Sequence, residues 1–151
     1  MKKASWLLMK AQLNLKTLGM TYWRSISPFQ AALYRRDKNR PSVIMWSVAN
    51  EPRSQQIPAG PYFGNLTDYV RSLDSTRPVT AAINQGLSSD LASKSLDVIM
   101  LNRYYAWYSD TGHLNVITIQ TETEFNNWFS TYNKPIMISE YGAGTIPGLH
   151  F

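Results

Sequence analysis

The chain has 151 residues, a length that indicates a single domain. Hydrophobic residues make up 44% of it and aromatic residues 13%, so it can bury a core, and most of it is not expected to be disordered. It contains no cysteine, which excludes disulfides and thiolate metal sites. The net charge of +5 is spread along the sequence, with one small cluster, R-R-D-K-N-R, at residues 35–40. This cluster either binds a phosphate or an acidic ligand, or is the solvated end of a helix.

Several classes of protein fit the sequence poorly. No run approaches the ~18–20 apolar residues of a membrane-spanning helix, so no membrane partner is expected. The basic start, M-K-K-A-S-W-L-L-M-K, makes a poor secretory signal because Lys10 interrupts its apolar part early. A nucleic-acid partner is not expected, since the chain has neither a known binding motif nor a dense basic stripe. The triplet Asn65-Leu66-Thr67 is an N-glycosylation pattern, which matters only if the chain enters the secretory pathway.

The first predicted elements are a helix and a strand. Residues 1–30 show neither a helical stripe nor a strand pattern and are left unassigned, while residues 31–151 form the predicted domain. A-A-L-Y-R-R-D-K-N, from Ala31, is predicted to be helical. R-P-S-V-I-M-W-S-V follows from Arg40 and predicts a strand, since proline is tolerated at the first residue of a strand.

The rest of the chain alternates helices with apolar runs. A helical stripe from Tyr62 is formed by Tyr62, Leu66, Tyr69, Val70 and Leu73, and another from Thr121 is formed by Phe125, Trp128, Phe129 and Tyr132. These aromatic side chains are predicted to lie in the core. Further strands are predicted at R-P-V-T-A-A-I from Arg77, L-D-V-I-M-L-N from Leu96 and K-P-I-M-I-S from Lys134. All the runs are apolar without alternation, as strands covered on both faces are. The sequence therefore predicts a strand–helix unit repeated four times, and an α/β fold with a parallel sheet.

Polar side chains follow each predicted strand. The first strand ends in Asn50-Glu51, the second in Asn84-Gln85, the third in Asn102-Arg103-Tyr104-Tyr105 and the fourth in Ser139-Glu140-Tyr141. In parallel α/β folds chemistry gathers at these carboxyl ends. Two of the ends carry a glutamate.

Two glutamates at one edge suit the cleavage of a glycosidic bond. That reaction needs a carboxylic acid to protonate the leaving oxygen and a carboxylate on the other side of the anomeric carbon. Tyrosine and asparagine can hydrogen-bond a carboxylate or a sugar hydroxyl, and Trp107 and Tyr108 could cover a sugar face. The alternative is structural, in that Glu51 caps the following turn and Glu140 pairs with a basic residue such as Arg103.

Four segments resemble the β-glucuronidases of glycoside hydrolase family 2. They are W-S-V-A-N-E-P, S-L-D-S-T-R-P-V-T, L-N-R-Y-Y-A-W-Y and P-I-M-I-S-E-Y-G-A, and they occur in the order of the family from about Arg35 onwards. The resemblance implies a (β/α)8 TIM barrel of which this chain supplies about strands 4 to 7. It also implies a retaining O-glycosyl hydrolase that cleaves β-D-glucuronides by double displacement, through a covalent glycosyl-enzyme.

The resemblance also assigns roles to residues. Glu51 resembles the general acid/base, which follows strand 4, and Glu140 resembles the nucleophile, which follows strand 7. Asn50 resembles the residue that binds the sugar 2-hydroxyl. Tyr104 resembles the residue that hydrogen-bonds the nucleophile, and Asn102 and Tyr108 resemble sugar-binding positions. The resemblance implies no cofactor and no metal.

The resemblance further implies a glucuronide or glycosaminoglycan-type substrate, a lysosomal or secreted location, and a homo-oligomer in full-length members. The chain departs from the family in lacking strands 1 to 3, strand 8 and the preceding β-sandwich domains. It also lacks the Asn-x-Lys motif that reads the sugar carboxylate, and it has Gly144 where the family commonly carries an acid. The alternative prediction is therefore a truncated, non-catalytic fragment without a complete active site.

Overall fold

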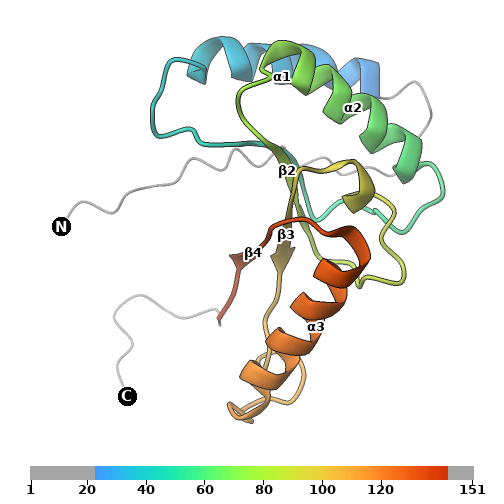
Figure 1. Ribbon diagram of the computed structural model, residues 1–151, viewed down its shortest axis with the longest axis vertical. Coiled ribbons are helices and arrows are strands. Elements are labelled where there is room, and N and C mark those ends of the chain that lie inside the picture. The colour runs from blue at the N-terminus through green and yellow to red at the C-terminus, as the bar shows by residue number, and fades with distance from the viewer. Residues whose placement is uncertain (1–22, 143–151) are drawn as a thin grey trace.

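Residues 23–142 of the chain are described by a computed structural model. Their centre is a parallel sheet of four strands, β1 (Trp46–Asn50), β2 (Val79–Ile83), β3 (Val98–Asn102) and β4 (Ile136–Glu140). The strands pair in chain order, β1-β2-β3-β4 (Figure 1). The predicted α/β class with a parallel sheet is confirmed. Parallel strands that pair in chain order are the arrangement expected of part of a (β/α)8 barrel.

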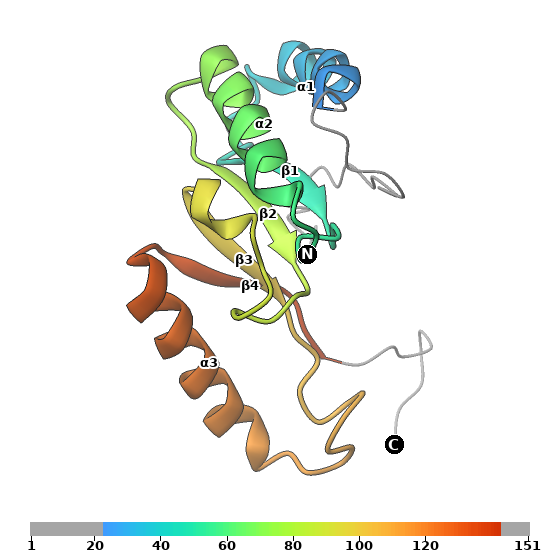
Figure 2. The ribbon, with the colours of Figure 1, turned by 90° about the vertical axis from the view of Figure 1, so that its right-hand side faces the viewer.

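The helices pack beside this sheet. They are α1 (Trp23–Asp37), α2 (Ala59–Leu73) and α3 (Val116–Tyr132), with a short 3-10 helix, η1 (Ser93–Ser95), between β2 and β3. α1 and α2 lie side by side near β1 and β2, whereas α3 lies beside the other end of the sheet and contacts β4 (Figure 2).

Two features differ from the sequence prediction. The only helical turn described between β2 and β3 is η1, so the prediction of a full helix after every strand is wrong at this connection. Residues 84–95 are rich in Asn, Gly, Ser and Asp, which favour turns over helix interiors. In addition, the helix predicted from Ala31 begins earlier, at Trp23, as α1.

α2 covers the sheet with one apolar face. Tyr62, Phe63, Leu66 and Val70 lie at helical spacing and are each at most 4% exposed. Complete burial of side chains of this size contributes roughly 1.5–3 kcal/mol each. Asn65, in the glycosylation pattern, is exposed on the opposite face of the helix.

α3 buries less of its predicted stripe. Trp128 is fully buried, and Phe125 and Tyr132 pack partly buried against the core. Phe129, however, is 54% exposed, so its assignment to the core is wrong. Neighbouring positions of a helix are 100° apart, and the sheet covers only the side that carries Trp128.

The strands differ in burial across the sheet. All residues of β2 and β3 are buried, as predicted for strands covered on both faces. β4 is only partly buried, and Met137 is 42% exposed. Pro78 and Pro135 directly precede β2 and β4, as predicted, but β1 begins at Trp46, well after Pro41.

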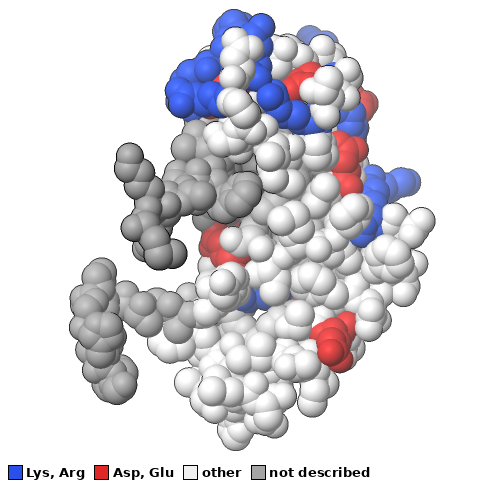
Figure 3. All heavy atoms as spheres, turned by 60° about the vertical axis from the view of Figure 1, so that its left-hand side comes forward, with Lys and Arg blue, Asp and Glu red and all other residues white. Residues whose placement is uncertain are grey.

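Basic side chains gather at the end of the molecule that carries α1 (Figure 3). Within residues 35–40, two arginines contact the buried carboxylate of Asp37, which lies 2.6 Å from Arg36 Nη2 and 2.9 Å from Arg40 Nε. The hydrogen bond from Arg36 is the main cause that lowers the pKa of Asp37. These pairs favour the interpretation of the cluster as a helix end over that of a ligand site.

Candidate active site

The predicted site residues lie together at the carboxyl end of the sheet, where the parallel strands end. Asn50 and Glu140 are the last residues of β1 and β4, and Asn102 is the last residue of β3. Glu51 directly follows β1, and its backbone N–H donates to the carbonyl of Ala82 on β2 (2.8 Å). Because all four strands are parallel, their carboxyl ends face the same side.

An irregularity in strand pairing precedes each of the two glutamates. β1 and β2 pair at Ser47 with Thr80 and next at Asn50 with Ala82, so β1 has one extra residue. β3 and β4 pair at Leu101 with Ile138 and next at Asn102 with Glu140, so Ser139 is unpaired in register. Such bulges re-aim side chains and are frequent beside active sites.

Glu51 has an unusual backbone conformation. Its φ angle is 48°, in the left-handed region that residues other than glycine seldom adopt. The residue is exposed. A left-handed conformation costs of order 1–3 kcal/mol and tends to occur at functional sites. The strain therefore marks Glu51 as a candidate functional residue independently of its charge.

Asn102 joins Glu51 to β4. Its Nδ2 donates to Glu51 Oε1 (2.7 Å), and Ser139 Oγ donates to its Oδ1 (2.6 Å). The Asn102 side chain is buried, with 4% of the residue exposed. The sequence predicts that Asn102 binds sugar, but in this structure both polar atoms of its amide contact protein groups.

Tyr104 lies next to Glu140. Its hydroxyl donates a short hydrogen bond to Glu140 Oε2. Burial, and then the negative charge of Glu51, raise the pKa of Tyr104, which keeps this hydroxyl protonated and able to donate. The ring of Tyr108 packs edge-on against Tyr104, with centroids 5.4 Å apart, and Tyr108 is 79% exposed.

The remaining predicted residue is Asn50. Its Oδ1 is buried, and none of the described residues donates a hydrogen bond to it. A buried acceptor without a donor is rare in proteins, so this oxygen is suited to a donor from outside, such as a sugar hydroxyl. A hollow of about 310 Å³ is lined in part by Asn102, Tyr104 and Tyr108, but not by Asn50 or by either glutamate of the candidate site.

A partly buried ionic network that the sequence analysis did not predict lies beside Asn102 and Tyr104, and its Arg103 and Glu124 line the same hollow. Arg103 Nε donates to both oxygens of Glu124 on α3 (2.9 and 2.8 Å), and Tyr105 also donates to this carboxylate. Burial alone would raise the pKa of Glu124, but these hydrogen bonds outweigh it and lower the pKa. Arg103 thus has a carboxylate partner other than Glu140. The sequence feature that could have indicated this network is Glu124, an acid four residues before Trp128 on the same helical stripe.

The guanidinium of Arg103 also holds the strand ends together. Its Nη1 donates to the carbonyl of Ile83 at the end of β2 (3.2 Å), and its Nη2 donates to that of Gln85 (3.0 Å). The backbone N–H of Arg103 donates to the carbonyl of Glu140 (2.9 Å). The side chain of Arg103 therefore fixes β2 and α3 relative to β3.

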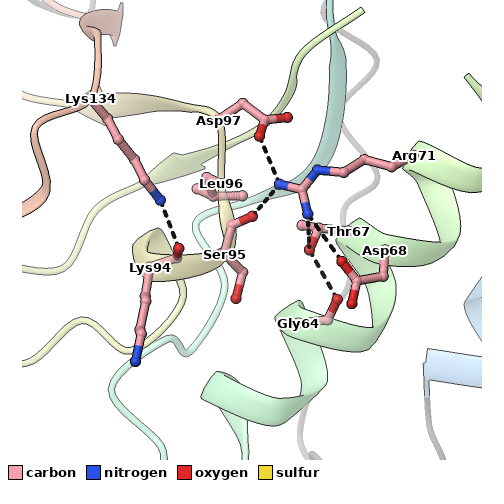
Figure 4. Close-up of a pocket in the computed structure, with 9 residues that line it drawn as sticks. All are labelled: Gly64, Thr67, Asp68, Arg71, Lys94, Ser95, Leu96, Asp97 and Lys134. Atoms are coloured by element: carbon pink, nitrogen blue, oxygen red, sulfur yellow. Dashed lines mark hydrogen bonds and ion pairs between the residues drawn. The ribbon is translucent and has the colours of Figure 1, made fainter. Parts of the chain in front are cut away.

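A second hollow, of about 400 Å³, lies where α2, η1 and the start of β3 meet (Figure 4). Arg71 Nη2 donates to Asp97 Oδ1 (2.8 Å) and to the carbonyl of Ser95 (2.6 Å). Lys134 Nζ donates to the carbonyl of Lys94 (2.6 Å). Because these cations are bonded to protein groups, we interpret this hollow as a packing junction.

Among residues 23–142, no group of three or more His, Asp or Glu side chains is arranged to hold a metal ion. No helix in the same range is long and apolar enough to cross a membrane. Gly144 lies outside the described residues, and so does Asn14-Leu15-Lys16, which matches Asn-x-Lys by chance because it precedes strand 4, whereas the family motif follows strand 8.

Comparisons with known proteins agree with this architecture. The family model of the TIM barrel domain of glycosyl hydrolases family 2 matches residues 11–151, further towards the N-terminus than the resemblance that begins near Arg35. The beta-glucuronidase of Felis catus is 54% identical over 118 residues, which are 78% of this chain and 18% of that protein. The beta-glucuronidase of Homo sapiens is 52% identical over 116 residues, which are 77% of this chain and 18% of that protein.

Solved structures give the same result. A beta-glucuronidase of an uncultured Clostridium sp. superposes with a TM-score of 0.79 at 40% identity, over 87% of this chain and 23% of that one. The beta-D-glucuronidase of Dictyoglomus thermophilum superposes with a TM-score of 0.79 at 45% identity, over 85% of this chain and 22% of that one. The chain thus spans about a fifth of the length of the relatives that it matches. It belongs to glycoside hydrolase family 2, as part of the TIM barrel domain of that family.

Proposed function

We propose that this chain supplies the catalytic carboxylates of a retaining glycoside hydrolase that cleaves β-D-glucuronides. In the proposed reaction an oxygen of Glu140 attacks the anomeric carbon, and the bond from that carbon to the leaving oxygen breaks. Glu51 donates a proton to the leaving oxygen. Glu51 then removes a proton from water, which attacks the anomeric carbon and releases the sugar from Glu140.

One observation carries the proposal. Glu51 follows β1 and Glu140 ends β4, the two outer strands, at the carboxyl end of the same sheet. Each carboxylate accepts a hydrogen bond from a residue at the end of β3, Asn102 or Tyr104. Double displacement needs a proton donor and a nucleophile in one site, and this end of the sheet carries a carboxylate for each role. The buried Oδ1 of Asn50, which has no donor among residues 23–142, and the exposed ring of Tyr108 support the proposed contacts with the sugar.

The substrate, location and assembly follow from the relatives. A glucuronide or glycosaminoglycan-type substrate is proposed because the similar proteins are named beta-glucuronidase. A lysosomal or secreted location and a homo-oligomer are proposed on family resemblance. The proposed catalytic domain takes in residues 31–151, and the continuity of α1 from Trp23 favours an earlier start.

A second candidate function is a non-catalytic fragment. The observation that favours it is the open sheet, since β1 and β4 each have a strand neighbour on one side only among the described residues. A closed barrel of this type has eight strands. In this case the site residues are present, but the remaining half of the barrel has to come from elsewhere.

A complete barrel is needed to test the proposed roles. We define the hybrid enzyme as feline beta-glucuronidase in which the matching segment of this chain replaces the original one. Glu140→Gln should abolish turnover of every glucuronide. Glu51→Gln should lower kcat/KM by ~10²–10⁴-fold for phenyl glucuronide and far less for a dinitrophenyl glucuronide, whose leaving group needs no proton.

The control is Glu122→Gln, on the exposed surface of α3, which should behave as the unmodified hybrid does. Equal losses for both leaving groups in Glu51→Gln would contradict the role of that residue. Residual turnover in Glu140→Gln near the unmodified rate would contradict the proposed nucleophile.

A further inference from the structure

Ser139 contacts the site although it is neither of the proposed catalytic groups. It lies between Ile138 and Glu140 on β4, and its hydroxyl donates to Asn102 Oδ1 (2.6 Å). Asn102 Nδ2 in turn donates to Glu51 Oε1 (2.7 Å). Three side chains from two neighbouring strands and the end of a third therefore form one hydrogen-bonded chain that ends on the proposed acid/base.

The chemistry of the partners fixes which way the Asn102 amide faces. An ionised carboxylate only accepts hydrogen bonds, so the NH₂ group of Asn102 must face Glu51, and Oδ1 must face away. A hydroxyl is the donor that Oδ1 then requires. In the flipped orientation, Oδ1 would face the Glu51 carboxylate, and two acceptors would oppose each other. The carboxylate of Glu51 thus selects the orientation, and Ser139 anchors the amide in it by donating to Oδ1.

This orientation also decides which oxygen of Glu51 carries a proton. Oε1 accepts the N–H of Asn102, and an oxygen that accepts this bond at 2.7 Å is the carbonyl oxygen of a protonated carboxyl group. The proton of the acid form is thereby directed to Oε2. No other described group hydrogen-bonds to the carboxylate of Glu51, so Oε2 remains open to a leaving group.

We propose that Ser139 is a positioning residue which, through Asn102, holds Glu51 with its acid proton on Oε2. The inference rests on the proposed function, because it assigns a role within that reaction. The irregular register explains how one strand can supply it. Since Asn102 pairs with Glu140 and Leu101 with Ile138, Ser139 is the extra residue of β4, and it can face the site together with Glu140.

The test compares two substitutions of Ser139 in the hybrid enzyme. Ser139→Ala should lower kcat/KM for phenyl glucuronide by about 10-fold and for the dinitrophenyl glucuronide by less than about 2-fold, since only the poor leaving group needs the proton. Ser139→Thr retains the hydroxyl and should recover most of the loss. The matched control is Ser47→Ala. Ser47 is also a strand serine, and among the described residues its hydroxyl donates to a backbone carbonyl within β1, that of Ala49 (3.3 Å), so this variant should show neither effect.

A crystal structure of the hybrid with Ser139→Ala gives a readout independent of turnover. The distance from Asn102 Nδ2 to Glu51 Oε1 should lengthen beyond about 3.2 Å, the limit of a good hydrogen bond. Retention of the 2.7 Å contact, or equal losses for both leaving groups, would overturn the proposal. Failure of the proposed function would give a different result. The unmodified hybrid would then hydrolyse glucuronides no faster than its Glu140→Gln variant. The crystal structure would still show whether Ser139 positions Asn102 and Glu51.

Discussion

At the residue scale, the contact between Tyr104 and Glu140 gives the first prediction. The hydroxyl donates to the carboxylate, and its raised pKa keeps it a donor. Hydrogen bonds to charged groups contribute about 1.5–3 kcal/mol, so Tyr104→Phe in the hybrid enzyme should lower kcat by about 10- to 100-fold. Stopped-flow or steady-state assays with a fluorogenic glucuronide measure this.

The control for that substitution is Tyr34→Phe. Tyr34 also packs edge-on against an aromatic ring, that of Trp46, with ring centroids 5.8 Å apart. It lies in α1 and contacts the amino end of β1, whereas the candidate site lies at the carboxyl ends of the strands. It should keep kcat within about 2-fold, in line with a substitution away from the site. A Tyr104→Phe enzyme as fast as the control would show that the hydrogen bond has no part in the reaction.

The sequence predicts which residues form the candidate site but not the hydrogen bonds between them. Glu51 and Glu140 were predicted because each follows an apolar run at a strand end. The left-handed backbone of Glu51 could not be predicted, since glutamate has no preference for positive φ. The bond from Ser139 to Asn102 depends on one unpaired residue in β4, and strand register is a property of the assembled sheet.

At the scale of elements, the network of Arg103 and Glu124 couples α3 to β3. Glu124→Leu would leave the guanidinium of Arg103, whose side chain is 11% exposed, without its carboxylate. An uncompensated buried charge typically costs 3–5 kcal/mol, so the Tm of the hybrid should fall by several degrees. Glu122→Leu, at an exposed position of the same helix, should leave the Tm within about 1 °C, and an equal fall in both variants would contradict the structural role of Glu124.

Asp74 provides a second prediction at this scale, on pH. The carboxylate accepts hydrogen bonds from Trp46 Nε1 (2.9 Å), from Thr76 and from Arg77 (3.0 Å), and so joins β1 to the turn between α2 and β2. Burial alone would raise the pKa of Asp74, but the hydrogen bonds from Thr76, Trp46 and Arg77 together lower it to about 2.

A lowered pKa in the folded state means that the ionised carboxylate contributes stability above the ordinary pKa of 3.8 and loses it as the pH falls towards 2. The full contribution is about 2 kcal/mol. Asp74→Asn in the hybrid should therefore lower the Tm most at pH 7, and the difference from the unmodified hybrid should shrink below pH 4. A difference that stays constant from pH 7 to pH 3 would contradict this.

Element prediction succeeded where the pattern is local. The apolar runs that follow Pro78 and Pro135 are strands, and the stripe that contains Leu66 and Val70 is the buried face of α2. It failed at the start of α1, where Pro28 lies inside the helix and hides the helical pattern. The connection between β2 and β3, which has only η1, was predicted wrongly because a helix was assumed to follow every strand.

At the scale of the whole molecule, the sheet has two edge strands among the described residues, β1 and β4. A barrel of ~250 residues closes such edges, and open edges invite aggregation. We therefore expect the purified 151-residue chain to hydrolyse a fluorogenic glucuronide no faster than its own Glu140→Gln variant. A misplacement of 1 Å in the site is enough to cost ~10²-fold in rate.

Turnover by the isolated chain clearly above that variant would contradict this expectation. It would mean that four strands, or two copies of them, hold both carboxylates in place. A circular-dichroism melting curve of the same sample reports whether the chain is folded, since a sheet without its partners should melt broadly or not at all.

The central claim, that Glu140 is the nucleophile and Glu51 the acid/base, is tested most directly by trapping the covalent intermediate. The hybrid enzyme is incubated with a 2-deoxy-2-fluoro-glucuronide that has a good leaving group, because the fluorine slows hydrolysis of the glycosyl-enzyme. Peptide mass spectrometry should find one sugar label, on the peptide that carries Glu140 and at that residue. A label on Glu51 or elsewhere, or an active hybrid that takes up no label, would contradict the account.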